Sequence, residues 1–225
     1  MKRRIALAVL VAGALALAGC SGGGGDETGP ADVSIRVAVT DPQQLIPGRQ
    51  SIAYDFNMAV WSPLAFLQSD GTLQNVQAES IESDDAQTWT ITLRDGWTFH
   101  DGTPVTAQSY VDSWNAVAYG PNAFENSGQL ASIVGYTDLN PAEGTPTTTA
   151  MSGLTVVDDL TFTVELVSPD GQFPLQVTQA QTAFFPMPES ALSDFDAYNA
   201  HPRGQRTVSD DGRLRRERAD HGFRV

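Results

Sequence analysis

Side chains that commonly perform chemistry are scarce in this sequence of 225 residues, which contains one cysteine and three histidines. His100 precedes Asp101, and such a pair could serve as a general acid and base. Because His100-Asp-Gly102 is typical of a tight turn, we interpret His100 as a solvent-exposed turn residue. The sequence has no Cys or His cluster with metal-binding spacing, no Gly-x-Ser-x-Gly and no phosphate-binding loop. These patterns favour a protein that is not an enzyme and holds no metal or cofactor.

The single cysteine, Cys20, follows a basic start and an apolar run. Positions 2–4 are Lys-Arg-Arg, and residues 5–18 are apolar apart from one glycine. The run is too short for a permanent transmembrane helix and ends in small residues, as secretory signals do. Leu17-Ala-Gly-Cys20 resembles the lipobox of bacterial lipoproteins, which implies that residues 1–19 are a cleaved signal peptide. A lipid on Cys20 would then anchor the exported protein to the outer face of the bacterial cell membrane, in the periplasm of a Gram-negative cell. The alternative is an inert buried thiol.

Charge divides the sequence into three parts. Residues 1–20 are basic, residues 21–202 contain 23 Asp and Glu against three Arg, and residues 203–225 contain seven Arg against four acids. The acidic central part repels nucleic acid and anionic lipid head groups, so we expect neither as a partner. A single cysteine allows no disulfide within the chain, so an apolar core must hold the fold.

The central part contains patterns of both strands and helices. Residues 20–30 are Gly-rich and are typical of a flexible tether before a domain at 31–202. Alternation predicts strands at 33–39, 88–93 and 97–99, and a hairpin of 154–157 with 161–167. Helical spacing predicts helices at 54–67, with Pro63 as a kink or boundary, from the N-cap Thr106 through Val117, and within the loop-rich 121–149 near 130–134. We therefore expect an α/β fold of the mixed α+β kind, with antiparallel hairpins.

A long ordered motif runs through Trp89-Thr-Ile-Thr-Leu-Arg-Asp-Gly-Trp-Thr-Phe-His-Asp-Gly-Thr-Pro-Val-Thr-Ala107 and continues at Ser113-Trp114. Together with residues 71–80 and 153–166, it resembles extracellular solute-binding protein family 5, the oligopeptide-, dipeptide- and nickel-binding components of bacterial ABC importers. The aromatic residues of the motif should pack the hairpin against the following helix, which makes the motif structural. The resemblance implies a periplasmic-binding-protein-like fold, of which this chain holds an amino-terminal fragment with the first strand of lobe I and the family's extra domain.

The resemblance also implies a function and a ligand-binding region. The expected function is capture of a peptide or similar small solute and its delivery to an ABC permease in the membrane. Aligning Leu45-Ile-Pro47 with the family's Leu-Asp-Pro places one ligand-contacting segment just after it, and a second follows the Trp114 helix. The expected ligand contacts are Ser51, Ile52, Ala53, Phe124 and Asn126. The alternative for all five is ordinary loop or core packing.

The end of the sequence departs from the family pattern. His201-Pro202 begins the family's His-Pro-(Val or Ile)-Gly-Asn-Gly-Pro-Tyr motif, which breaks off at Arg203. A reverse translation with one base removed at Pro202 restores Pro-Val-Gly-Asn-Gly-Pro-Tyr. We therefore predict that residues 203–225 are out of frame and that the chain lacks part of the ligand cleft. The alternative is a functional Arg-rich tail that binds nucleic acid or acidic lipid. Alternative functions are a structural lipoprotein of the cell surface, a hydrolytic enzyme, or a non-functional truncated product.

Overall fold

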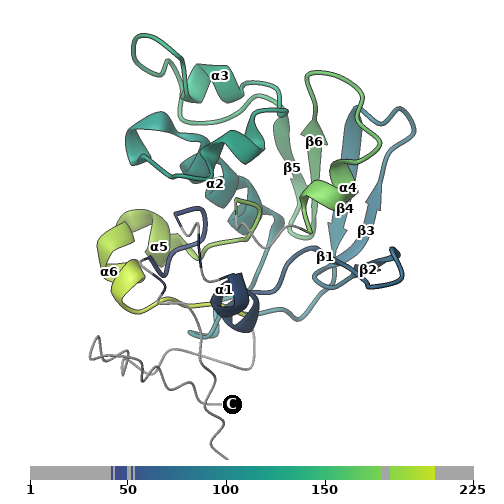
Figure 1. Ribbon diagram of the computed structural model, residues 1–225, viewed down its shortest axis with the longest axis horizontal. Helices are drawn as coiled ribbons and strands as arrows, with labels where there is room; N and C mark the ends of the chain where they lie inside the picture. Colours follow the sequence, from purple (N-terminus) through teal and green to yellow (C-terminus); the bar gives the residue numbers. More distant parts are fainter. Residues whose placement is uncertain (1–41, 43, 50–51, 53, 179–182, 206–225) are drawn as a thin grey trace, which may run out of the picture. The chain divides into compact units, whose positions relative to one another are not determined.

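Four strands form an antiparallel sheet in the order β3-β4-β6-β5 (Figure 1). The computed structural model describes residues 42, 44–49, 52, 54–178 and 183–205. The strands are β3 (Ala78–Glu82), β4 (Thr88–Leu93), β5 (Leu154–Asp158) and β6 (Thr161–Glu165). Ile91 lies opposite Phe162 in the central pair, on the buried face, while threonines alternate on the other face. The predicted strand at 88–93 and the predicted hairpin at 154–167 are confirmed, with β6 ending at Glu165.

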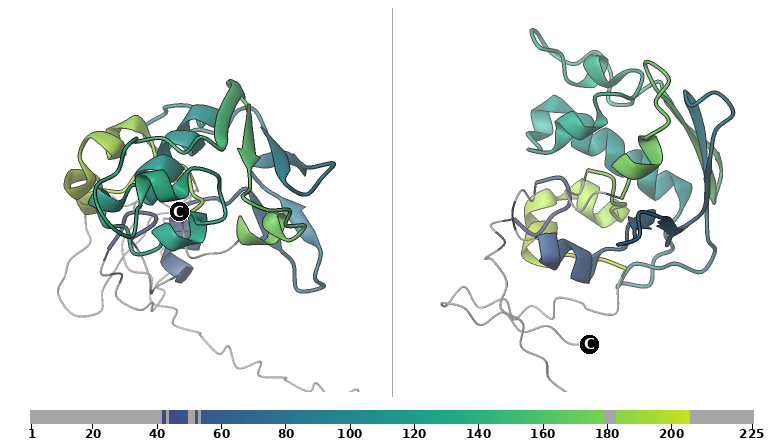
Figure 2. Two further views of the ribbon diagram at one scale, coloured as in Figure 1. Left: turned by 90° about the horizontal axis from the view of Figure 1, so that it is seen from above. Right: turned by 45° about the vertical axis from the view of Figure 1, so that its right-hand side comes forward.

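Helix α2 (Ala107–Ala118) covers the buried face of this sheet (Figures 1 and 2). Thr106 begins the helix as its N-cap, because its hydroxyl accepts the Ser109 N–H while the Ser109 hydroxyl accepts the Thr106 N–H. The fully buried Trp114 meets the Phe162 ring edge-on, with ring centroids 5.5 Å apart. The predicted helix and its packing against the sheet through Trp114 are confirmed.

The segment before the sheet is a short helix followed by a small hairpin. These elements are α1 (Tyr54–Val60), β1 (Ala65–Leu67) and β2 (Leu73–Asn75), with β1 and β2 antiparallel. The helix predicted over 54–67 is wrong beyond Val60, because Pro63 has no N–H to donate and its ring obstructs a continuing helix. Gly71, at φ +84°, makes the turn between the two strands.

The strand predicted at 97–99 is also wrong, since it makes only an isolated bridge between Thr98 and Pro104. The Phe99 N–H still donates to the Thr103 carbonyl, at 2.8 Å. The Val105 N–H donates to the Trp97 carbonyl at 2.9 Å on the other side of the bridge, and the pairing ends there because the chain turns at 100–102 and enters α2 after Thr106.

The long connection between α2 and β5 contains three short helical turns. They are η1 (Gly120–Asn122), η2 (Ser127–Leu130) and α3 (Tyr136–Leu139). The helical stretch predicted near 130–134 is wrong, because Ile133 forms a β-bridge with Leu166 and the Val134 N–H donates to the Glu165 carbonyl at 2.9 Å. The backbone groups of this segment therefore pair with the end of β6 instead of with a helical turn.

The described chain ends in three short helices and a buried terminal segment. The helices are α4 (Phe173–Gln176), α5 (Glu189–Ser193) and α6 (Phe195–Ala200), with α5 and α6 beside α2 on the side away from the sheet (Figures 1 and 2). The Gln205 N–H donates to the Val60 carbonyl at 3.0 Å. A Cβ at Gly204 would clash with the Val60 carbonyl oxygen, so this slot accepts only glycine.

Several predicted parts of the chain lie outside the described residues. They are the signal peptide at 1–19, Cys20, the tether at 20–30, the strand at 33–39 and all but the first three residues of 203–225. Among the residues that are described, no helix has both the length and the apolar character needed to cross a membrane.

Candidate ligand-binding site

The two segments predicted to contact ligand are joined through Gly48. The Asn126 N–H donates to the Gly48 carbonyl at 3.0 Å. Gly48 has φ +84°, and a Cβ there would lie 2.6 Å from Phe124 Cδ1 and 2.8 Å from Val117 Cγ2. A glycine is therefore required by both the backbone conformation and the close approach. The chain just before position 51 is thereby held against the loop after α2.

Arg49 contacts the loop after α2 and also α6. Its guanidinium carbon lies 4.8 Å from the Phe124 ring centroid and 5.3 Å from the Phe195 ring centroid. Its Nη2 donates to the Asn122 carbonyl at 3.1 Å, and its Nη1 lies 3.7 Å from Asp196 Oδ1. The Asp196 side chain is 97% exposed, so its ion pair is weak and the two aromatic faces dominate the contact. One cation thus links the segment at 44–49, the loop after α2 and α6.

The predicted contact residues differ in how much surface they offer. Ile52 is 37% exposed and Asn126 is half-buried, so both have surface available. Phe124 is 4% exposed, and its ring packs edge-on against Phe195 with centroids 5.2 Å apart. Ser51 and Ala53 lie outside the described residues. The described geometry thus gives Phe124 a packing role and leaves Ile52 and Asn126 accessible.

His100 is half-buried, so its interpretation as a solvent-exposed turn residue is wrong. Its ring Nδ1 accepts the backbone N–H of Gly204 at 3.1 Å, and the backbone N–H of His100 donates to the Gly204 carbonyl at 2.9 Å. The neighbouring Asp101 accepts the Thr103 N–H at 3.0 Å and the Thr103 hydroxyl at 2.6 Å. Partial burial opposes ionisation of Asp101, but these two hydrogen bonds and the charge of Arg203 outweigh it and lower the pKa of its carboxyl. These contacts give the His100-Asp101 pair a structural role.

Tyr198 connects the terminal segment to the core. Burial raises the pKa of its hydroxyl well above the ordinary range, so the group stays neutral. The hydroxyl donates to the Arg203 carbonyl at 2.7 Å and accepts the Trp61 indole N–H at 3.4 Å. Within the described ranges, no group of three or more His, Cys, Asp or Glu side chains could hold a metal ion.

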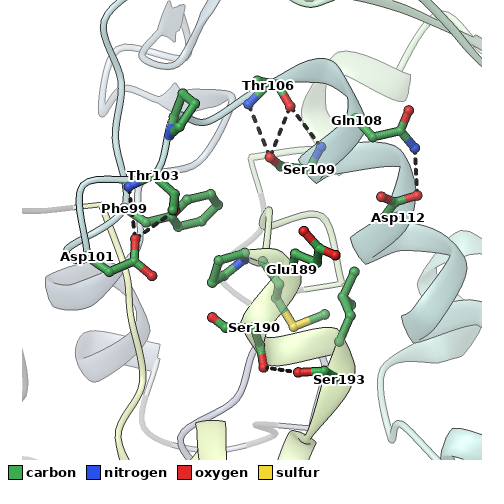
Figure 3. A pocket seen from close by; sticks show the side chains of 14 residues that line it. Phe99, Asp101, Thr103, Thr106, Gln108, Ser109, Asp112, Glu189, Ser190 and Ser193 are labelled. Carbon is green, nitrogen blue, oxygen red and sulfur yellow. Dashed lines mark hydrogen bonds between the residues drawn. The ribbon is translucent and has the colours of Figure 1, made fainter.

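A separate cavity of ≈ 700 Å³ lies between the turn at 99–106, the start of α2 and α5 (Figure 3). Asp101, Asp112 and Glu189 line it together with Ser and Thr hydroxyls. Sequence reasoning missed this cavity, because its two walls come from segments far apart in the chain. The acidic residues on either wall show no pattern in sequence that would have joined them.

The family model described as bacterial extracellular solute-binding proteins, family 5 Middle, matches residues 72–207. The chain belongs to this family. The match contains the whole four-stranded sheet and α2, so the predicted resemblance is confirmed on the elements that carry the motif. Since relatives in this family are solute-binding proteins, the prediction that the chain is not an enzyme is also confirmed.

This family 5 chain is similar to several peptide-binding proteins. It is 30% identical over 151 residues to the oligopeptide-binding protein OppA of Bacillus subtilis, an alignment that covers 66% of this chain and 27% of that protein. The structure of the Escherichia coli murein tripeptide binding protein MppA matches 78% of this chain and 34% of that chain, with a TM-score of 0.63 and 24% identity. Haemophilus influenzae OppA in complex with the peptide RPPGFSPFR matches 70% of this chain and 31% of that chain, with a TM-score of 0.62 and 24% identity. The predicted periplasmic-binding-protein-like fold is confirmed, and the chain spans a minor part of each relative's length.

Proposed function

We propose that this chain forms part of a lipid-anchored solute-binding component of an ABC importer and that the solute is a peptide. Family membership over residues 72–207 carries this proposal. The similarity to relatives named for binding oligopeptides and murein tripeptide supports a peptide as the solute. The acidic central part, with 23 Asp and Glu against three Arg, supports export without nucleic-acid partners.

We propose Ser51, Ile52, Ala53 and Asn126 as direct solute contacts, and Phe124 as a residue that positions them. In this proposal Ile52 offers apolar surface to a peptide side chain and Asn126 offers amide groups to the peptide backbone. Phe124 acts indirectly, by holding Arg49 and Gly48 in place. The hydrogen bond between Gly48 and Asn126 supports a single site built from both segments.

We further propose that the opposite wall of the site comes from residues that this chain does not contain. The alignment with Bacillus subtilis OppA covers only 27% of that protein, which supports this view. Closure of two lobes around the peptide, followed by docking to a membrane permease, would then complete capture. In this proposal residues 203–225 are out of frame, and removing one base at Pro202 supplies the missing part.

Calorimetric titration with the nonapeptide RPPGFSPFR tests peptide capture. Two proteins are compared: the chain of 225 residues and the product of the gene with one base removed at Pro202. We expect saturable binding by the longer product and weak or no binding by the shorter chain, because half of the cleft wall is absent. In the longer product, Asn126→Ala should weaken binding, whereas Thr90→Ala on the outer face of β4 should not. Absence of binding by both proteins would refute peptide capture and leave a structural lipoprotein or a non-functional product.

Replacement of Cys20 tests the anchor separately. Cells expressing the natural chain should incorporate a radioactive fatty acid into it and retain it in the membrane fraction. Cys20→Ala should abolish labelling and leave an uncut precursor or a released protein, whereas Ser21→Ala should behave as the natural chain does. Membrane retention of a processed Cys20→Ala protein would contradict the proposed lipid anchor.

A further inference from the structure

Two neighbouring cavities form one groove along α2. The cavity of ≈ 700 Å³ in Figure 3 and a second of ≈ 360 Å³ share Asp112 and Leu192. The first reaches from the turn at 99–106 to α5, and the second continues to Tyr119 and Phe195. The groove therefore follows the whole outward face of α2, whose 12 residues span about 18 Å.

The groove has an apolar floor and an acidic rim. Phe99 and Met187 are almost fully buried and form part of the floor, and Leu192 lies between the two cavities. The rim carries three carboxylates, on Asp101, Asp112 and Glu189, and several hydroxyl groups (Figure 3). Among the described residues that line it there is no Lys or Arg. Such a groove matches an occupant that presents both basic and apolar side chains.

The last described residues join both walls at one end of the groove. Gly204 exchanges two hydrogen bonds with His100, beside Asp101 on one wall. The Gln205 amide Nε2 donates to the Pro186 carbonyl at 3.4 Å, beside Met187 on the other wall. Arg203 is close enough for its charge to lower the pKa of Asp101. The described chain thus ends at residues that contact neighbours of both walls of the groove.

Residues 206–225 have the composition that the groove favours. They contain six Arg against four acids, and Arg213-Leu-Arg-Arg-Glu-Arg218 combines four positive charges with one negative charge and an apolar side chain. The stretch from Thr207 to Arg213 can span about 23 Å when extended, which exceeds the length of α2. We propose that residues 206–225 dock in the groove along α2, with their arginines against Asp101, Asp112 and Glu189. This proposal is independent of peptide capture. It concerns the chain of 225 residues that carries this tail.

Trypsin cleavage of the full chain tests this docking, because only three arginines lie in residues 21–202. Mass spectrometry follows the appearance of carboxy-terminal fragments. The groove variant carries three substitutions that remove its carboxylates: Asp101→Asn, Asp112→Asn and Glu189→Gln. We expect cleavage at Arg213 to Arg218 to be about tenfold faster in this variant, because three partly exposed ion pairs are lost. The control variant Glu79→Gln, Asp138→Asn, Glu143→Gln changes charge equally at exposed sites outside the groove and should cleave at the natural rate.

A disulfide test does not depend on the groove variant folding normally. In a Cys20→Ser background, Ser193→Cys in the groove should cross-link with Leu214→Cys under mild oxidation, whereas Thr90→Cys on the outer face of β4 should not. Equal cleavage rates in both charge variants, or equal cross-linking at positions 193 and 90, would overturn the proposal. Cross-linking or protection that grows with protein concentration would also overturn it, since the occupant would then be the tail of a second copy.

Discussion

The sheet with α2 and the terminal layer formed by residues 44–49 and 203–205 are stabilised by different kinds of contact. In the sheet, distant partners form a continuous ladder over a buried core, as Ile91 of β4 pairs with Phe162 of β6, and the cap of Thr106 with Ser109 supports it locally. In the terminal layer the partners are also distant: Gly204 and His100 are separated by 104 residues. Both regions therefore require closure of long loops, but the sheet offsets that cost with a whole ladder and a buried aromatic core, whereas the terminal layer offsets it with isolated hydrogen bonds such as Gly204 to His100. We therefore expect the terminal layer to open before the sheet does.

The largest effect is expected at Trp114, which lies in the core between α2 and the sheet. Trp114→Ala should lower the free energy of unfolding by about 3–5 kcal/mol, because a fully buried ring is replaced by a cavity. Trp97→Ala should cost clearly less, since Trp97 is only partly buried. Urea denaturation followed by circular dichroism measures both. Equal costs for the two tryptophans would contradict the central place given to Trp114.

A smaller effect, confined to the terminal layer, is expected at Gly48. Gly48→Ala should cost about 2–4 kcal/mol, because left-handed backbone strain is added to a clash with Phe124. Gly71→Ala is the matched control: Gly71 has the same φ of +84°, but a Cβ there would have no atom within 4 Å, so only the strain remains. Hydrogen exchange should show faster opening near Asn126 and unchanged protection in β4. Uniform loss of protection would show that the two regions unfold as one.

The N-cap of α2 provides a test of the local contacts alone. Thr106→Ala should destabilise the fold by about 1 kcal/mol, because one N–H of the first helical turn loses its acceptor. Thr106→Ser keeps the hydroxyl and should retain most of the stability. Thermal unfolding of the three proteins measures this order, and an unchanged midpoint for Thr106→Ala would show that the cap contributes nothing.

The smallest effect concerns how the free energy of unfolding declines at acid pH. The folded-state pKa of Asp101 is lowered from its ordinary value of 3.8, despite opposing burial, by the Thr103 hydrogen bonds and the Arg203 charge. Its contribution is therefore present above that value and is lost as the pH falls through the lower folded-state pKa. Asp101→Asn should lower stability slightly at neutral pH and flatten the decline in this range, so that the curves of the two proteins converge at low pH. An identical acid decline in both proteins would contradict the role of Asp101.

Sequence reasoning located the elements that depend on neighbouring residues. The alternation at 88–93 and the Thr106 N-cap predicted β4 and α2 well, because each signal lies within the element itself. The motif around them also identified the family. Pro63 was predicted as a kink or boundary of the helix at 54–67, but the apolar spacing gave no sign that the chain beyond it would form a strand. Residues 65–67 pair with β2.

Contacts between distant residues could not be predicted in the same way. The pattern at 130–134 gives no sign that Val134 will donate to Glu165, and a histidine in a turn motif gives no sign of a partner at Gly204. The predicted contacts Ser51, Ile52, Ala53, Phe124 and Asn126 came from a family resemblance, and their ligand role stays a prediction. Arg49 was visible as one of three arginines in residues 21–202, but only its position between two rings reveals its role.

The slot that holds Gly204 and Gln205 selects for a glycine followed by an amide side chain. The Gln205 Oε1 accepts the Ser62 N–H at 3.3 Å, and Arg203 is exposed. The family's Val-Gly-Asn would place the same two features at these positions. A change of reading frame at Pro202 would therefore leave the last anchors of the body intact. Cellular proteases that detect poorly packed chains would then meet the same packed body in both products, the chain of 225 residues and the longer one.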